Sequence, residues 1–147
     1  LKPIQKIASG GELARIMLAL KNVLAENDQV TTMVFDEVDT GVSGRAAQKV
    51  AEKLYEVARE RQVLCVTHLP QIAAMGDVHF SVEKGEADGR TFTAVERLDR
   101  ERRRQELARL TSGDHVTDTA LSGAEELLSA AEQWKKSGSG ASAARKQ

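Results

Sequence analysis

The chain has 147 residues, and its 21 Lys and Arg against 22 Asp and Glu give a formal net charge of −1. This balance neither supports nor excludes a nucleic-acid partner, but an aromatic content of 3% leaves no visible base-stacking surface. One cysteine, Cys65, excludes a disulfide within the chain and fits a reducing compartment. Because Cys65 lies in an apolar run, it is predicted to be a small buried residue rather than a nucleophile.

The first predicted helix opens with Ser9-Gly10-Gly11-Glu12 and continues to Leu24. Ser9 is the expected N-cap, and Glu12 is its capping-box partner three residues later. The two glycines leave the first backbone N–H groups open, which makes a competent anion site. The alternative is an ordinary capped helix. The apolar stripe that should face the core consists of residues at helical spacing: Leu13, Ile16, Met17, Leu20 and Leu24.

An apolar, β-branched stretch, Val30–Glu37, ends in two adjacent carboxylates, Asp36 and Glu37. Its composition is typical of a buried strand in a parallel sheet. Ligands of open α/β sheets bind beyond the carboxyl ends of the strands, where two carboxylates suit a hard cation and a water to be activated. A solvated strand end followed by a turn is the alternative.

A second strand with a polar end follows after a helix. The loop Val38–Gly44 leads into a predicted helix over Arg45–Arg61, and the strand Gln62–Thr67 ends at His68. A strand, a helix and a strand in this order form a parallel βαβ unit. We therefore expect Asp36, Glu37 and His68 to lie at one edge of one sheet.

The rest of the sequence predicts helices, a pair of strands and a disordered C-terminal tail. Residues 1–136 are expected to form one lobe, and residues 137–147, rich in Ser, Gly and Ala, a disordered tail. A basic run from Arg97 to Arg104 is interleaved with acids and predicts a salt-bridged, solvated helix face rather than a DNA contact. The predicted elements are a short helix with Pro70 in its first turn, two strands and two helices: Leu69–Met75, Asp77–Glu83, Arg90–Leu98 (joined by the hairpin loop Lys84–Gly89), Arg100–Leu110 and Asp118–Trp134.

Four motifs in a fixed order resemble the C-terminal half of an ATP-binding-cassette (ABC) ATPase head. Ser9-Gly10-Gly11-Glu12 resembles the signature motif, and Met33–Glu37 resembles the Walker B strand with its catalytic Glu. Val38–Gly41 resembles the D-loop, and Thr67-His68 the switch histidine. The longer stretches Ile7–Ile16, Phe35–Gly44 and Cys65–Ala73 are similar to the RecN family of bacterial DNA repair proteins, which is related to the structural-maintenance-of-chromosomes (SMC) ATPases.

The resemblance implies a role for each motif residue. Asp36 would help to hold Mg²⁺, usually through water, while Glu37 and His68 would be catalytic: Glu37 orients and deprotonates the attacking water, and His68 contacts the γ-phosphate. Ser9, Gly10, Gly11 and Glu12 would bind the ATP held by an opposite head, with Asp39 acting across the same interface. Arg15, one helical turn past the glycines, is a further candidate for this interface, but a surface arginine is the favoured prediction.

The family's Walker A run, G-x-x-x-x-G-K-[ST], does not occur in this sequence. Since the chain also begins at Leu1, we expect a segment of a larger protein: the C-terminal lobe of a P-loop ABC/SMC-type head, an α/β fold with a mainly parallel sheet flanked by helices and a C-terminal hairpin and helices. The expected partners are a Walker A-bearing N-terminal lobe of the same protein, a second head in an ATP-sandwiched homodimer, and DNA.

The resemblance implies a cytoplasmic, nucleoid-associated ATPase with no membrane partner, acting in double-strand-break repair and recombination. Two alternatives remain open at this point. The chain could be a lobe of another ABC-type ATPase, or a non-catalytic α/β interaction module in which the acids and glycines serve packing.

Overall fold

The computed structural model describes residues 9–23, 30–87 and 89–143, and the chain divides into two compact units, Leu1–Met75 and Gly76–Gln147. Each unit contains a two-stranded sheet, parallel in the first and antiparallel in the second. The predicted α/β class is confirmed, but the parallel strands do not dominate, because the antiparallel pair is the longer one. The single lobe over residues 1–136 stays a prediction.

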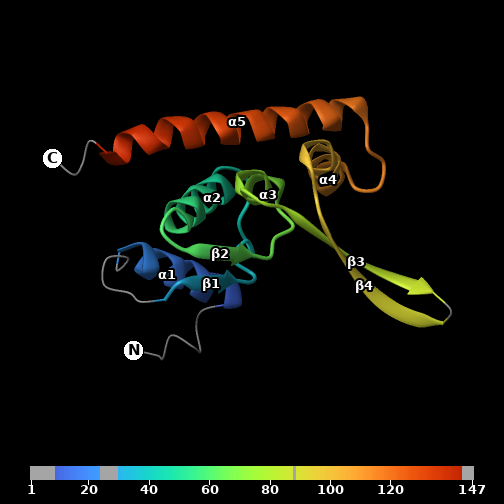
Figure 1. Cartoon of the computed structure of the whole chain (residues 1–147), viewed down its shortest axis with the longest axis horizontal. Helices are drawn as coiled ribbons and strands as arrows, with labels where there is room; N and C mark the ends of the chain where they lie inside the picture. Colours follow the sequence, from blue (N-terminus) through green and yellow to red (C-terminus); the bar gives the residue numbers. More distant parts are fainter. Residues whose placement is uncertain (1–8, 24–29, 88, 144–147) are drawn as a thin grey trace. The chain divides into compact units, whose positions relative to one another are not determined.

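The first unit is a strand–helix–strand arrangement preceded and followed by a helix (Figure 1). β1 and β2 run parallel, with Val34 opposite Leu64, so the predicted βαβ pairing is confirmed. α2 packs against α1, α3 and β2, and its buried face includes Ala47, Ala51, Leu54 and Val57. The elements are α1 (Gly10–Val23), β1 (Thr32–Phe35), α2 (Gly44–Ala58), β2 (Gln62–Cys65) and α3 (Pro70–Met75).

Two burial predictions for the first unit are wrong. β1 was expected to be buried on both faces, yet only Met33 and Phe35 are buried and Val34 is 67% exposed. Leu64 and Val66 share the exposed face with Val34, because parallel register puts Val34 beside Leu64. In the part of the chain that the structure describes, nothing covers this face, so the strand alternates instead of being buried throughout.

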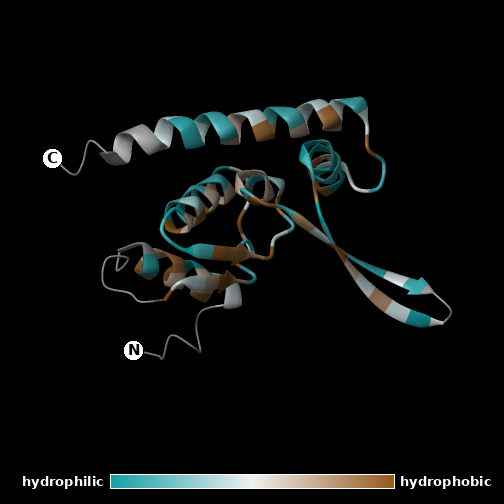
Figure 2. Ribbon diagram, in the orientation of Figure 1, coloured by the Kyte–Doolittle hydropathy of each residue, from teal (hydrophilic) through white to brown (hydrophobic). Residues whose placement is uncertain are grey.

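The second wrong burial prediction concerns the apolar residues of α1, whose hydrophobic colouring is visible in Figure 2. The predicted inward stripe is largely exposed at Ile16, Met17 and Leu20, whereas Leu18 is buried. Helical spacing identifies an apolar stripe but not the element that covers it. The last predicted member, Leu24, lies outside the described residues.

The second unit consists of a hairpin and two helices: β3 (Phe80–Ala87), β4 (Arg90–Arg97), α4 (Arg100–Ser112) and α5 (Asp118–Ala143). The hairpin loop predicted over Lys84–Gly89 is wrong, because residues 84–87 pair with residues 90–93 as strand. The chain reverses between Ala87 and Arg90, and Gly89 has φ +70°, a conformation that glycine adopts without a steric penalty. α4 and α5 pack together around Leu107, Ala108, Ala124, Leu128 and Ala131, all buried.

The predicted end of the last helix is also wrong. α5 continues from Asp118 to Ala143 and so includes most of the segment 137–147 that was expected to be a disordered tail. Adding a residue to an existing helix costs far less than starting one, and alanine favours the helix. Residues 144–147 lie outside the described part. Among the described helices, none combines the length and apolarity that crossing a membrane would need.

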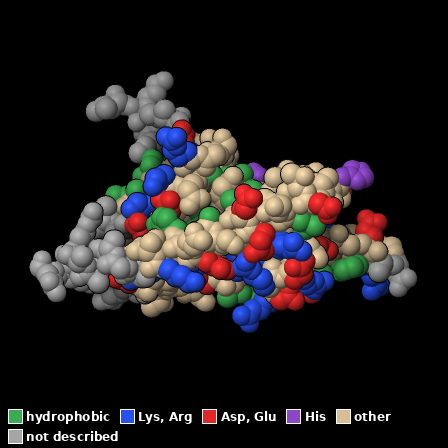
Figure 3. Space-filling model, turned by 90° about the horizontal axis from the view of Figure 1, so that it is seen from above, with side chains coloured by type: hydrophobic (Ala, Val, Ile, Leu, Met, Phe, Trp, Pro, Cys, Tyr) green, Lys and Arg blue, Asp and Glu red, His purple; other side chains and the backbone are tan. Residues whose placement is uncertain are grey.

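The basic run at α4 is neutralised by neighbouring acids, as predicted. Arg100 pairs with Glu125 and Glu132, Arg102 with Glu96, and Arg104 with Glu101. Figure 3 shows basic and acidic side chains intermixed on the face that it presents. Such exposed pairs contribute little to stability but prevent a strongly charged single-sign patch.

Candidate functional site

The tip of β1 carries two exposed carboxylates in an unusual backbone conformation. Asp36 Oδ1 accepts a hydrogen bond of 2.9 Å from the Glu37 backbone N–H. Glu37 has φ +59° and is the only described residue other than glycine with a positive φ. A non-glycine residue in this region costs free energy and persists only where surrounding contacts hold it. The tip is therefore a constrained turn rather than a frayed strand end.

The glycines of α1 provide the space for this turn. A Cβ atom on Gly11 would lie 2.8 Å from the Glu37 carbonyl oxygen and 2.8 Å from Thr40 Cβ. A Cβ atom on Gly10 would collide with Glu37 Oε2. The helix entrance and the strand tip thus touch within one chain. This gives Gly11 a structural reason beyond the predicted anion site, whereas the Gly10 clash is only with the end of a flexible side chain.

The predicted capping box at the start of α1 is confirmed. Ser9 N–H donates to Glu12 Oε2 at 2.7 Å, and Glu12 N–H donates to Ser9 Oγ at 3.3 Å. The hydrogen bonds from the Ser9 backbone and hydroxyl lower the pKa of Glu12. In this arrangement the Glu12 carboxylate holds the cap, and its predicted nucleotide contact stays a prediction.

Asp39 is a buried carboxylate, 4% exposed, that ties the loop after β1 to the end of β2. Its Oδ2 atom accepts from Thr67 Oγ1 at 2.6 Å and from the His68 backbone N–H at 3.0 Å, and it lies 3.1 Å from His68 Nδ1. Burial alone would raise the pKa of Asp39, but the hydrogen bonds from Thr67 and His68 outweigh it and lower the pKa.

This network places His68 at the edge predicted for it. The imidazole ring is 74% exposed and is held only on its Nδ1 side by Asp39, which leaves Nε2 toward solvent. Thr67 was not predicted as a site residue, although its position directly before His68 at a strand end was the available signal. The predicted role of Asp39 across a dimer interface stays a prediction.

Arg15 lies one helical turn beyond the glycines and contacts the same loop. Its Nη1 atom donates to the carbonyl oxygens of Thr40 at 2.7 Å and Val38 at 3.2 Å. Arg15 is half-buried, so the surface arginine favoured from the sequence is not what the structure shows.

The carboxylates at the strand tip could supply only part of the ligand shell of a Mg²⁺ ion. Mg²⁺ is usually bound through one or two carboxylates, with water and substrate phosphates supplying the other ligands. Asp36 is an exposed carboxylate of this kind. No group of three or more His, Cys, Asp or Glu side chains forms a metal cage in the described ranges. The residues present therefore suit a metal that arrives with a nucleotide.

Cys65 does not contribute a nucleophile to the site. Burial, and then the charges of Asp39 and Asp36, raise the pKa of the thiol to about 12, so the reactive thiolate is scarce at neutral pH. The prediction of an unreactive small residue is supported.

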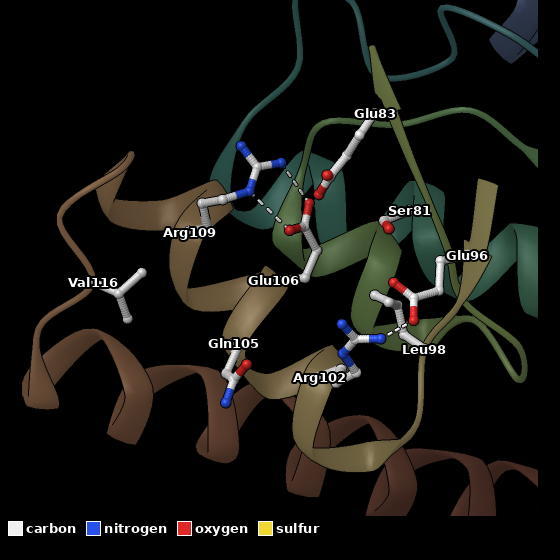
Figure 4. Close-up of a pocket in the computed structure, with 9 residues that line it drawn as sticks. All are labelled: Ser81, Glu83, Glu96, Leu98, Arg102, Gln105, Glu106, Arg109 and Val116. Carbon is white, nitrogen blue, oxygen red and sulfur yellow. Dashed lines mark hydrogen bonds and ion pairs between the residues drawn. The ribbon is translucent and has the colours of Figure 1, made fainter. Parts of the chain in front are cut away.

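A surface pocket of about 230 Å³ lies in the second unit and contains none of the predicted site residues (Figure 4). Four of its five charged residues are paired, Arg102 with Glu96 and Arg109 with Glu106. The pocket is therefore a salt-bridged hollow between the hairpin and α4, and the predicted chemistry belongs to the first unit.

Comparison with known proteins gives a consistent match. A scan of protein-family models matched none. The chain is 50% identical over 138 residues to the DNA repair protein RecN of Bacillus subtilis, which covers 94% of this chain and 24% of that protein. The chain resembles one segment of RecN. It is also 50% identical over 127 residues to RecN of Halalkalibacterium halodurans and 48% identical over 129 residues to RecN of Treponema pallidum.

The RecN resemblance predicted from the motifs is thereby confirmed, and the chain spans about a quarter of the length of the RecN proteins it matches. The match extends over 86–94% of this chain and so includes both units. The comparison covers this segment of the RecN proteins and not the activity of the whole molecules.

Proposed function

We propose that the chain is the C-terminal lobe of an SMC-like ATPase head that hydrolyses ATP at a head–head interface during DNA double-strand-break repair and recombination. One observation carries the proposal: the carboxylates at the tip of β1, the histidine held by Asp39 after β2 and the glycine entrance of α1 come together in one unit. These groups match the signature, Walker B, D-loop and switch motifs in order. Similarity to RecN proteins, named for DNA repair, supports the biological setting.

Each residue has a part in the proposed hydrolysis. Bound Mg²⁺ would neutralise charge on the phosphate oxygens, and Asp36 would hold it, through water. Glu37 orients a water molecule and accepts its proton as the water oxygen attacks the γ-phosphorus and the bond to the bridging oxygen breaks. His68, steadied by Asp39 on Nδ1, presents Nε2 to the γ-phosphate.

The exposed apolar surface of the first unit supports the proposal of a missing partner lobe. Val34, Leu64 and Val66 form an uncovered sheet face, and Ile16, Met17 and Leu20 form an exposed stripe on α1. Surfaces of this kind mark places where another protein segment packs. The proposed occupant is the Walker A-bearing lobe of the same protein, which would also cradle the nucleotide.

The proposed dimer depends on the residues at the start of α1. Ser9, Gly10 and Gly11 would bind the γ-phosphate of ATP held by the opposite head, so that two heads enclose two nucleotides. DNA is the proposed partner of the full-length protein, and the cytoplasmic nucleoid is its proposed location. ATP would close the heads, and hydrolysis would reopen them.

The deciding experiment is ATP turnover by the full-length protein carrying Glu37→Gln. We expect turnover to fall by about 10²-fold or more, because a positioned base supplies a factor of this order, while ATP binding measured by equilibrium titration is retained. The matched control is Glu60→Gln, which changes an exposed glutamate after α2 in the same unit.

Normal turnover by Glu37→Gln would contradict the assignment of the base. Absence of turnover in the unmodified full-length protein, and in this chain mixed with its Walker A-bearing lobe, would instead favour the non-catalytic interaction module.

A further inference from the structure

Arg15 holds a backbone loop rather than a side-chain partner. Its guanidinium donates to the carbonyl oxygens of Val38 and Thr40, which lie 23 and 25 residues away in the sequence. These two carbonyls flank Asp39, the residue whose carboxylate binds Thr67 and His68. One side chain on α1 therefore sets the position of the loop on both sides of Asp39.

The loop held by Arg15 begins at the proposed catalytic base. Thr40 N–H donates to the Glu37 carbonyl oxygen at 3.0 Å, which closes a tight turn over residues 37–40. Glu37 has positive φ within this turn, and such a conformation needs external contacts to persist. The bond from Arg15 to the Thr40 carbonyl supplies one of them, and the close packing of Gly11 against Glu37 O and Thr40 supplies another.

The contacts of Arg15 differ from those of two arginines on α4. Arg104 and Arg109 pair with glutamates one helical turn away on the same exposed helix, an arrangement that fixes nothing beyond the helix itself. Arg15 is half-buried and bridges two elements. Both bonds come from Nη1, whose two N–H donors are held in the guanidinium plane, whereas the three donors of a lysine ammonium rotate freely.

We infer that Arg15 is a positioning residue that locks the entrance of α1 to the loop carrying Glu37 and Asp39, so that the signature and Walker B motifs move as one body. The inference rests on the proposed ATPase function. The role of Arg15 is indirect. It acts through Glu37, whose placement it fixes, and through Asp39, which in turn orients His68.

The test compares Arg15→Lys with the unmodified full-length protein in steady-state ATP hydrolysis. We expect kcat to fall on the order of tenfold, because small displacements of a reacting group are costly, while KM for ATP stays within about twofold, since substrate binding alone does not depend on the base. The matched control is Arg61→Lys, since Arg61 also donates to a backbone carbonyl, that of Val30, at the opposite end of β1.

A second measurement does not depend on turnover. Hydrogen exchange of the Thr40 and Val42 amides, both bonded within the loop, should become several-fold faster in Arg15→Lys than in Arg61→Lys. Unchanged kcat with unchanged exchange would overturn the inference, as would a parallel loss of kcat, ATP affinity and thermal stability, which marks a general folding role. An inactive unmodified protein with faster loop exchange in Arg15→Lys would refute the ATPase proposal and leave the lock intact.

Discussion

Arg15 and Asp39 in the first unit and Arg104 and Arg109 of α4 in the second unit use their charges in opposite ways. In the first unit, Asp39 and Arg15 bond to groups more than 20 residues away, and most of those partners are backbone atoms. In the second unit, Arg104 and Arg109 bond to glutamates three residues away on an exposed helix. Long-range bonds to the backbone fix the relative positions of elements, whereas local surface pairs contribute little to stability.

This difference separates the loop after β1, which needs a fixed geometry, from the exposed face of α4. The first unit contains a positive-φ glutamate, a buried carboxylate and glycines in close contact with a neighbouring loop. Strained or costly features of this kind gather where function needs exact placement. Substitutions should therefore be severe in the first unit and mild in the second, and the following experiments test that contrast.

The largest effect is expected for Asp39→Ala. The substitution leaves Thr67 Oγ1 and the His68 N–H without their buried acceptor, and the unsatisfied groups should cost about 2–4 kcal/mol of stability. Hydrogen exchange of the β1 and β2 amides reports the first unit, and exchange there should become faster. The fluorescence of Trp134, the only tryptophan, reports the second unit. The unfolding transition that it follows should be the same as in the unmodified chain.

Asp77→Ala is the control for this experiment, since Asp77 pairs with Lys135 on the surface of the second unit. A loss of stability in Asp39→Ala no larger than that in Asp77→Ala would show that the buried hydrogen bonds of Asp39 do not stabilise the first unit.

Two helical glycines provide the next contrast. Gly11→Ala places a Cβ atom 2.8 Å from the Glu37 carbonyl oxygen, and such overpacking should destabilise the first unit by about 1–3 kcal/mol. Gly123→Ala meets no atom within 4 Å in the interior of α5 and should stabilise the second unit by about 0.5–1 kcal/mol. Urea unfolding, followed by amide exchange and by Trp134 fluorescence, measures both changes. Equal signs for the two glycines would contradict the contrast.

The parts of this site that were predictable from sequence are those with local causes. The capping box of Ser9 and Glu12 depends on residues three apart, and the shared edge of Asp36 and His68 follows from a strand–helix–strand order. Both signals lie within short windows of sequence. They gave the correct elements in the first unit and the correct pairing of β1 with β2.

The parts that were missed depend on contacts between distant segments. Nothing near Arg15 in the sequence indicates that the carbonyls of Val38 and Thr40 lie beside it. The spacing of Ile16, Met17 and Leu20 identifies an apolar stripe without its cover, so burial was predicted where exposure is found. At the C-terminal end, Ser and Gly composition suggested disorder, but helix extension past Trp134 needs only small increments of free energy per residue.

Acid should weaken the first unit through Asp39. Its pKa is lower in the folded chain than in an unfolded one, where an Asp titrates near about 4. The stability that its charge contributes is therefore fully present above that pH and is lost as the pH falls below it. We expect the stability difference between the unmodified chain and Asp39→Asn to narrow as pH is lowered toward 3. A constant difference from pH 6 to pH 3 would show that ionisation of Asp39 contributes nothing.

The smallest effect is expected for the pair Arg104 and Glu101 on α4. These side chains lie 2.6 Å apart on an exposed helix face, and pairs of this type contribute about 0.3–0.5 kcal/mol. A double-mutant cycle with Arg104→Ala and Glu101→Ala, followed by Trp134 fluorescence in urea, should give a coupling energy within this range that decreases at high salt. A coupling above about 1 kcal/mol would exceed what exposed pairs contribute, and it would mean that this pair, too, fixes geometry.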